Sequence, residues 1–158
     1  MNARTIEILL VEDNPHDIEL TLHAFEKRNL ANRVHVVRDG EEALDFLFHR
    51  GAFVGRAGLR RPRVVLLDLK LPKVDGLEVL RTIRNDRALA TLPVVVMTSS
   101  REERDLVESY ELGVNSYIVK PIEFTSFIDT ASTLGLYWLL LNEPPPSTEN
   151  GIPEEAAS

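Results

Sequence analysis

The stretch Val64-Val65-Leu66-Leu67-Asp68 is a short apolar run that ends in a carboxylate. Three similar apolar runs occupy residues 6–11, 94–97 and 117–119, and residues 34–37 form a weaker fifth run. These runs are rich in β-branched side chains and lack regular polar alternation, which is typical of strands covered on both faces. The sequence therefore predicts five strands in a parallel sheet, with the weakest run at an edge.

Segments with helical spacing separate the apolar runs. The first helix is expected to begin at Asn14-Pro15, because asparagine caps helices and proline suits the first helical position. Asp17 then favours the positive end of the helix dipole. A second helix is expected after Gly40 and a third after Gly76, each with large apolar side chains on one face.

A fourth helix is expected to open with a capping box formed by Ser100 and Glu103 and to close at Gly113. The fifth is expected to span residues 123–141, where apolar side chains recur at helical spacing. Three consecutive prolines follow, and the last segment is rich in Pro, Ser, Glu and Gly. We therefore expect one folded domain over residues 1–141 and a disordered, acidic, proline-rich tail over residues 142–158.

The alternation of five strands with five helices indicates an α/β fold with right-handed crossovers. The expected architecture is a flavodoxin-like, doubly wound parallel sheet with strand order 2-1-3-4-5. In such a sheet, ligands bind beyond the carboxyl ends of the strands, where the strand order reverses. The residues that directly follow the strands are therefore the first candidates for a functional site.

The composition argues against several classes of protein. The sequence contains no run of about eighteen apolar residues, so it predicts no membrane span. The N-terminus lacks the pattern of a secretory signal. The absence of cysteine excludes disulfides and thiolate metal sites. The net charge is −7; four of the 25 acidic residues lie in residues 142–158, which leaves 21 acidic and 18 basic residues elsewhere. Such a surface does not attract nucleic acid. Together, these features lead us to expect a cytoplasmic protein that binds neither nucleic acid nor membranes.

Four of the predicted strands end in residues that carry chemistry. These residues are Glu12 and Asp13 after the first strand, Asp68 after the third, Thr98 after the fourth and Lys120 after the fifth. Two like charges 4 Å apart repel by about 4 kcal/mol at an effective dielectric constant of about 20. Three carboxylates therefore need a cation, a proton or strong hydrogen-bond donors. Oxygen ligands without cysteine or clustered histidine favour a hard ion, Mg²⁺ before Zn²⁺.

The same groups suit phosphoryl transfer. Asp68 is the best nucleophile candidate, because it lies on the central strand between the acidic pair and the side of Thr98 and Lys120. A carboxylate can form an acyl phosphate. Lys120 would neutralise the oxygens of the transferred group, and Thr98 would offer a hydroxyl donor. The sequence therefore predicts a phosphoacceptor site with these three residues in the catalytic roles.

The expected metal ligands are Asp13 and Asp68 directly, Glu12 through water, and the backbone carbonyl of Lys70. Each feature alone has a simpler explanation: an acidic pair before Asn-Pro is often a helix cap, and an aspartate after a strand is often a turn former. Four strand ends with compatible chemistry are hard to explain in this way. The combination favours a joint metal and phosphoryl site.

The sequence resembles the receiver domain of two-component response regulators. The segments that carry the resemblance are ILLVEDN (residues 8–14), LLDL (66–69), LPKVDG (71–76), VMTS (96–99) and YIVKP (117–121). Together with the helices between them, they extend the resemblance over roughly residues 5–140. Any one segment is weak evidence, whereas the combination is specific.

The resemblance implies that Asp68 receives a phosphoryl group from a phosphohistidine of a sensor histidine kinase, with Mg²⁺ required. It implies a cis peptide between Lys120 and Pro121, and a switch in which Thr98 and Tyr117 follow the phosphoryl group inward. Output would appear on the face of the fourth helix, fifth strand and fifth helix. Such a domain is a phosphoacceptor with at most self-catalysed phosphotransfer and dephosphorylation, not an enzyme.

Some positions refine or qualify the resemblance. Glu12 stands where an aspartate is commoner in the family, and its longer side chain is compatible with an outer-shell metal role. Lys70 and Ser100 stand where the family tunes the lifetime of the acyl phosphate. Three segments are similar to the single-domain regulators that partner phytochromes: residues 41–47, the arginine-rich residues 50–63, and residues 136–141. We therefore expect a phytochrome-type sensor kinase as partner.

The apolar residues near the end of the predicted fifth helix suggest self-association. Residues 138–141 are consecutive and apolar, so at least one side chain should face outward on a helix, and an exposed apolar patch often marks an interface. Tyr137, Trp138 and Leu141 are the candidate residues of a homodimer interface built on the fifth strand and fifth helix. The alternative is that this overhang packs on its own domain.

Two other functions remain open. One is an aspartyl-phosphate hydrolase on a related sheet; such enzymes carry two acids separated by one residue after the first strand, whereas Glu12 and Asp13 are adjacent. The other is an interaction module that keeps the fold without phosphorylation. Retention of Asp68, Thr98 and Lys120 argues against this second alternative.

Overall fold

The computed structural model describes residues 7–27, 33–56, 61–136, 148–149 and 152–153. Its five-stranded sheet is parallel throughout and has the order β2-β1-β3-β4-β5. The strands are β1 (Ile8–Val11), β2 (Val34–Val37), β3 (Val64–Asp68), β4 (Val94–Thr98) and β5 (Ser116–Val119). The predicted flavodoxin-like topology is confirmed.

Five α-helices alternate with the strands of the sheet. They are α1 (Pro15–Glu26), α2 (Gly40–Phe48), α3 (Gly76–Asn85), α4 (Arg101–Ser109) and α5 (Phe124–Thr133). The capping signals read from the sequence are present: the Asn14 side chain accepts a hydrogen bond from Asp17 N, and Ser100 Oγ accepts one from Glu103 N. Local sequence therefore sets where these two helices begin.

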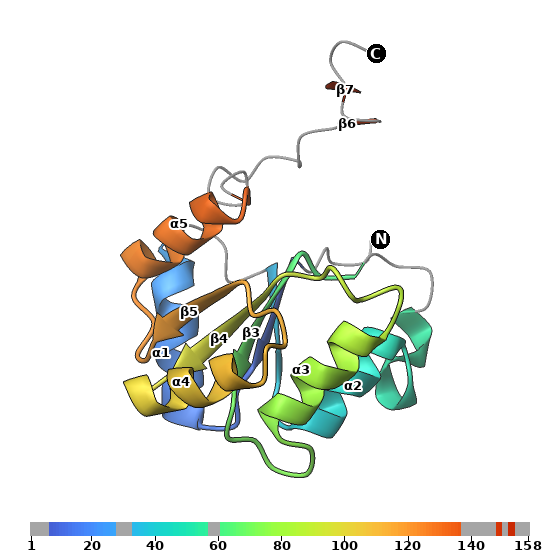
Figure 1. The fold of residues 1–158 in the computed structure, drawn as a ribbon, viewed down its shortest axis with the longest axis horizontal. Coiled ribbons are helices and arrows are strands. Elements are labelled where there is room, and N and C mark those ends of the chain that lie inside the picture. Colours follow the sequence, from blue (N-terminus) through green and yellow to red (C-terminus); the bar gives the residue numbers. More distant parts are fainter. Residues whose placement is uncertain (1–6, 28–32, 57–60, 137–147, 150–151, 154–158) are drawn as a thin grey trace.

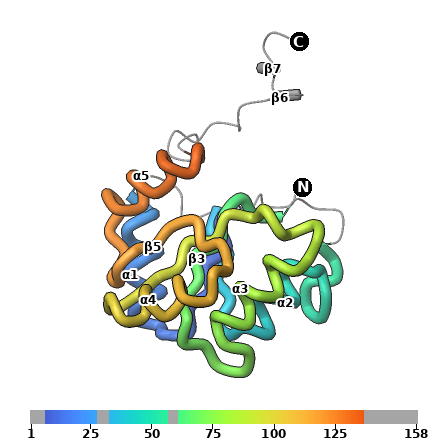
Figure 2. Tube along the Cα trace, in the orientation of Figure 1, coloured from blue at the N-terminus to red at the C-terminus, as the bar shows by residue number. Residues whose placement is uncertain are grey.

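The helices cover both faces of the sheet, and alternate residues of each strand supply two separate cores. Leu9 and Val11 of β1 belong to the core under α2, α3 and α4, whereas Ile8 and Leu10 belong to the core under α1 and α5. Figures 1 and 2 show α1 and α5 together on one side of the sheet and α2 and α3 together on the other. This burial on both faces explains why the strands lack polar alternation.

Two predicted helix ends were wrong. α4 ends at Ser109, and Gly113 lies beyond it in a loop with φ of 71°. α5 ends at Thr133 instead of continuing to residue 141, because Gly135 adopts φ of 75° and its N–H donates to the Ser132 carbonyl. Glycine in this left-handed conformation is a common helix terminator.

Three short elements were not predicted. A 3₁₀ segment, η2 (Gly51–Arg56), follows α2 within the arginine-rich stretch. In the acidic tail, β6 (Thr148–Glu149) and β7 (Ile152–Pro153) pair in antiparallel fashion. Most of the tail lies outside the described residues, so its disorder and the domain boundary at residue 141 stay predictions.

Candidate functional site

The carboxyl ends of four neighbouring strands bring the predicted residues to one edge of the sheet. Asp68 is the last residue of β3 and Thr98 the last of β4. Glu12 directly follows β1, and Lys120 directly follows β5. Because the strand order is β1-β3-β4-β5, residues far apart in the sequence become neighbours at this edge.

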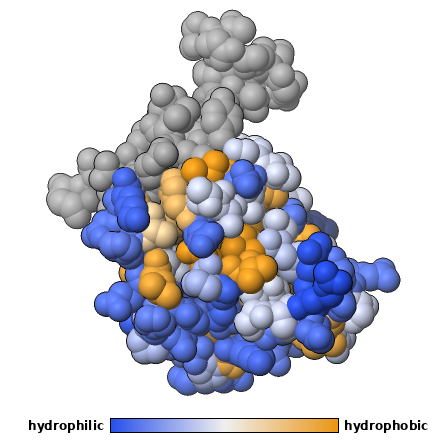
Figure 3. Space-filling view, turned by 90° about the vertical axis from the view of Figure 1, so that its left-hand side faces the viewer, coloured by the Kyte–Doolittle hydropathy of each residue, from blue (hydrophilic) through white to orange (hydrophobic). Residues whose placement is uncertain are grey.

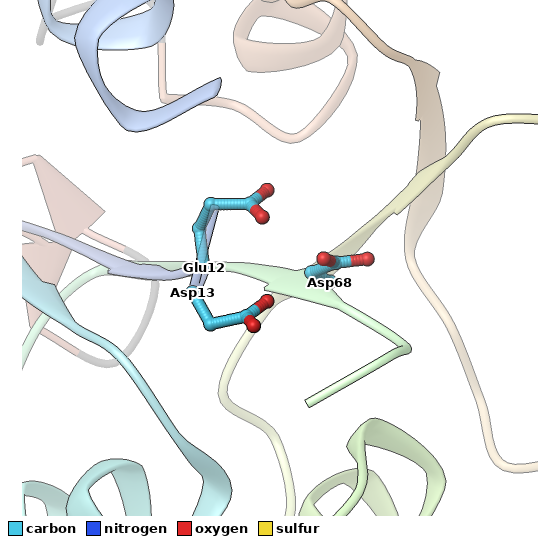
Figure 4. Close-up of side chains that lie close together, drawn as sticks. All are labelled: Glu12, Asp13 and Asp68. Atoms are coloured by element: carbon cyan, nitrogen blue, oxygen red, sulfur yellow. The ribbon is translucent and has the colours of Figure 1, made fainter. Parts of the chain in front are cut away.

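Three carboxylates form the centre of the site. Oxygen atoms of Glu12, Asp13 and Asp68 all lie within 4.8 Å of one another. Figure 4 shows Glu12 and Asp13 turning their carboxylates to the side on which Asp68 lies. Glu12 and Asp68 are buried, whereas Asp13 is exposed. This all-oxygen donor set fits a hard divalent cation with one face open to solvent.

Lys120 inserts its ammonium group into this carboxylate cluster. Nζ lies 3.3 Å from Glu12 Oε1, 3.3 Å from Asp68 Oδ2 and 3.1 Å from Asp17 Oδ2. An ammonium group has three N–H donors, so each can serve one carboxylate. The predicted neighbourhood of Asp68 and Lys120 is present, and Asp17 is an additional member.

The electrostatics of the site follow from crowding of charge in a partly buried space. Burial of the carboxyl group, followed by repulsion from Asp68, raises the pKa of Glu12 to about 7. Burial disfavours the charged form of Lys120, but the negative charges of Asp68 and Glu12 outweigh this effect and raise the pKa of Lys120 above its usual value. A second cation would relieve the remaining repulsion between the carboxylates.

Two further residues complete the predicted switch region. Thr98 is buried at the end of β4, and its carbonyl accepts a hydrogen bond of 2.8 Å from Lys120 N. Tyr117 is half-buried on β5, with the guanidinium of Arg104 4.8 Å from its ring centroid. The peptide between Lys120 and Pro121 is cis, as predicted. Thr98, Tyr117 and the cis peptide thus lie along the β4–β5 side of the site.

Residues 8–132 match the family of the response regulator receiver domain. The chain belongs to this family. The receiver fold, with its acidic pocket at the carboxyl edge of the sheet, accounts for the arrangement of the carboxylates and Lys120. The chain is therefore a receiver-domain response regulator, which is consistent with a phosphoacceptor role.

Individual relatives show which members of the receiver family this chain resembles. The bacteriophytochrome response regulator AtBRR shares 60% sequence identity and a TM-score of 0.80, covering 89% of this chain and all of that one. The response regulator Rcp1 of Synechocystis sp. is 37% identical over 84% of this chain and 88% of its own, and it has a solved Mn²⁺-bound form with a TM-score of 0.66. A third relative, "Probable methanogenesis regulatory protein FilR2" of Methanothrix harundinacea, is 45% identical over 87% of this chain and 86% of its own. The predicted similarity to regulators of phytochromes is confirmed.

In this receiver domain, Lys70 contacts a residue that the sequence did not connect with it. Lys70 Nζ lies 3.4 Å from Glu103 Oε2, and Glu103 also accepts a hydrogen bond of 3.0 Å from Ser99 N. Burial works against ionisation, but the Ser99 N–H and Lys70 lower the pKa of Glu103 below its usual value. Ser100 Oγ accepts a hydrogen bond of 3.2 Å from Glu103 N and so caps α4. Lys70 therefore links the loop after β3 to the first turn of α4.

A pocket of about 480 Å³ opens beside the carboxylates. Its walls come from the loop after β1, the loop after β3, α3 and α4. The lining residues include Asp13, Lys70, Leu71, Leu77, Glu103 and Leu106. The pocket is mostly apolar away from the carboxylates. It offers an approach to the carboxylate cluster from solvent.

Asp17 is the site residue that sequence reasoning missed. It was interpreted only as an acid near the start of α1, yet it makes the shortest of the three contacts with the Lys120 ammonium. The capping pattern that begins α1 fixes the position of Asp17, but nothing in the sequence indicates its partner 103 residues away. The dimer candidates Tyr137, Trp138 and Leu141 lie outside the described residues.

Within the residues that the structure describes, none of the helices combines the length and apolar character needed to cross a membrane.

Proposed function

We propose that Asp68 accepts a phosphoryl group from a phosphohistidine of a sensor histidine kinase, with Mg²⁺ as cofactor. The observation that carries the proposal is the joint position of Asp68 beside Lys120 and within the cluster of three carboxylates. The family membership supports a histidine kinase as the donor. The similarity to AtBRR, a bacteriophytochrome response regulator, favours a phytochrome-type kinase as the donor.

The residues present fit a magnesium ion. Asp13 and Asp68 would bind it directly, Glu12 would act through water, and the backbone carbonyl of Lys70 would supply a further oxygen. When bound, Mg²⁺ would neutralise the carboxylates and the oxygens of the transferring group. The solved Mn²⁺-bound form of Rcp1 is consistent with a divalent cation in such a site.

The side chains of this chain have distinct roles in the transfer. A carboxylate oxygen of Asp68 forms the new O–P bond as the P–N bond of the phosphohistidine breaks, and the imidazole leaves with the electron pair of that bond. The ammonium of Lys120, already 3.3 Å from Asp68 Oδ2, donates to an oxygen of the phosphoryl group. The hydroxyl of Thr98, at the end of the adjacent strand, supplies a second donor after phosphorylation.

The phosphorylated domain is proposed to signal through α4, β5 and α5. Val119 on the edge strand β5 is 69% exposed, and Leu106 on α4 is 51% exposed. Figure 3, which views this side of the molecule, shows hydrophobic side chains gathered among hydrophilic ones. An exposed edge strand beside apolar side chains is a typical interaction surface. The same surface is our candidate for homodimer formation through β5 and α5.

We propose a switch rather than an enzyme, with at most self-catalysed phosphotransfer and dephosphorylation. Incubation with Mg²⁺ and acetyl phosphate should add one phosphoryl group per chain, measured by intact mass. Omission of Mg²⁺ or the substitution Asp68→Asn should abolish the mass increase. An aspartyl-phosphate hydrolase would instead turn over added phosphate esters many times, and an inert interaction module would show no Mg²⁺-dependent change.

A further inference from the structure

Asp17 forms an ion pair with the ammonium group of Lys120, although it lies on helix α1 and not at the end of a strand. Its Oδ2 lies 3.1 Å from Lys120 Nζ, whereas the contacts with Glu12 and Asp68 are both 3.3 Å. Asp17 belongs to the first turn of α1, so this ion pair joins that helix to the turn after β5. The side chains of both partners are mostly buried, at 25% and 18% exposure.

Asp17 differs from the other two acceptors of Lys120 in what else it does. Glu12 and Asp68 belong to the carboxylate cluster that fits a metal ion, and Asp17 is not a member of that cluster in the described part of the chain. A metal ion would therefore engage Glu12 and Asp68 and leave Asp17 as the competing anion for Lys120. A phosphoryl group on Asp68 needs that same ammonium group.

We propose that Asp17 is a positioning residue that competes with the phosphoryl group for Lys120. This inference rests on the proposed function of Asp68. In the unphosphorylated domain, Asp17 shares the Lys120 ammonium with Glu12 and Asp68 and draws it toward α1. Upon phosphorylation, the ammonium moves from Asp17 to a phosphoryl oxygen, so the affinity of the site for a phosphoryl group is lower than it would be without Asp17.

The local structure of α1 keeps the free-energy cost of this exchange small. Asp17 N donates a hydrogen bond of 3.0 Å to the Asn14 side chain, so the backbone of the first turn is held independently of Lys120. A carboxylate in the first turn is stabilised by the partial positive charge of the helix N-terminus. Asp17 can therefore lose its partner while its backbone stays in place, and α1 keeps its starting point.

The test compares Asp17→Asn with wild type in the binding of fluoroberyllate, a mimic of the phosphoryl group, in the presence of Mg²⁺. Because the pair is partly exposed, its removal should tighten binding by roughly two- to fivefold. Glu19→Gln is the matched control: Glu19 lies on the exposed side of the same helix, and its substitution removes the same charge. This control should leave the dissociation constant within error of wild type.

A second readout separates positioning from a general charge effect. The NMR signal of the isotope-labelled Lys120 ammonium should shift in metal-free Asp17→Asn and stay unchanged in Glu19→Gln. Unchanged or weaker fluoroberyllate binding by Asp17→Asn, or an unmoved Lys120 signal, would overturn the inference. Failure of wild type to bind fluoroberyllate, or equal binding by Asp68→Asn, would instead overturn the proposed function.

Discussion

Gly76, the first residue of α3, lies directly against the backbone of the candidate phosphoacceptor Asp68. A β-carbon added to Gly76 would be 2.5 Å from the Asp68 carbonyl oxygen and 2.6 Å from Leu69 Cα. The Gly76 N–H also donates a hydrogen bond of 2.9 Å to the Leu69 carbonyl. The start of α3 thus packs against the end of β3 and the loop that follows Asp68, through contacts that no other residue type permits.

Gly76→Ala should therefore displace the loop after β3. Backbone atoms at these distances cannot yield without a shift of Asp68 or α3, so we expect a loss of about 1–3 kcal/mol in the free energy of unfolding. Phosphorylation by acetyl phosphate should slow in the folded fraction. Urea denaturation and intact-mass time courses measure the two effects.

Gly55→Ala is the control for this substitution. Gly55 lies in η2, and a β-carbon there would meet no atom within 4 Å. The free energy of unfolding of the Gly55→Ala variant should stay within about 0.5 kcal/mol of wild type. Equal effects of the two substitutions would contradict the role assigned to Gly76.

Lys120→Met should affect both phosphorylation and stability. It removes the cation that faces the buried carboxylates of Glu12 and Asp68, and a buried charge left without its partner is destabilising. Because Glu12, with its pKa of about 7, can take up a proton, we expect a loss of only about 2 kcal/mol in the metal-free protein. Mg²⁺ should restore most of this stability in thermal denaturation, while phosphorylation stays at least about tenfold slower.

Lys73→Met is the matched control for the loss of a lysine. The Lys73 side chain is 62% exposed, and its contacts with Asp39 and Glu41 are 3.8 and 3.7 Å long. Exposed ion pairs contribute little, so the stability change should be below about 0.5 kcal/mol and independent of Mg²⁺. A Mg²⁺-dependent effect of Lys73→Met would count against our explanation of Lys120.

Substitutions at Glu103 and Lys70 should differ although the two residues form an ion pair. Glu103→Ala removes the acceptor for Ser99 N and Ser99 Oγ as well, so we expect a loss of about 1 kcal/mol. Lys70→Ala should cost less than about 0.5 kcal/mol, because the Lys70 side chain is 82% exposed. Urea denaturation of both variants measures this difference, and equal losses would show that the ion pair itself is the main contribution.

Phe127→Ala should be the most destabilising of these substitutions. Phe127 is 2% exposed on α5, and its ring centroid lies 4.6 Å from that of Phe25 on α1. Removal of a buried phenylalanine side chain typically costs about 3–5 kcal/mol. Val54→Ala, at a position 65% exposed, should cost less than about 0.5 kcal/mol in the same denaturation experiment.

The sequence predicted the sheet and most of the site because each signal was local. A buried strand followed by a carboxylate, as at Asp68, can be recognised within a few residues, and the topology then specifies which strand ends meet. The contact between Asp17 and Lys120 was missed because it depends on the direction of a side chain in the first turn of α1. No spacing rule links two residues so far apart in the chain.

The prediction for the length of α5 was wrong for a different reason. The apolar spacing continues beyond Thr133 and favours a longer helix, whereas the glycine at position 135 favours an end there. In the structure, Gly135 adopts φ of 75° and ends the helix, which is the ordinary effect of glycine at this position. Helical periodicity alone therefore overestimated the length of α5.

The most direct test of the account is to locate the acyl phosphate. The protein is phosphorylated with Mg²⁺ and acetyl phosphate, reduced with borohydride to convert the phosphorylated aspartate to homoserine, and digested for peptide mass analysis. Our account predicts homoserine at position 68 alone. Modification of Asp13 or Glu12 instead, or an undiminished phosphoryl group on Asp68→Asn, would contradict the assignment of Asp68 as the phosphoacceptor.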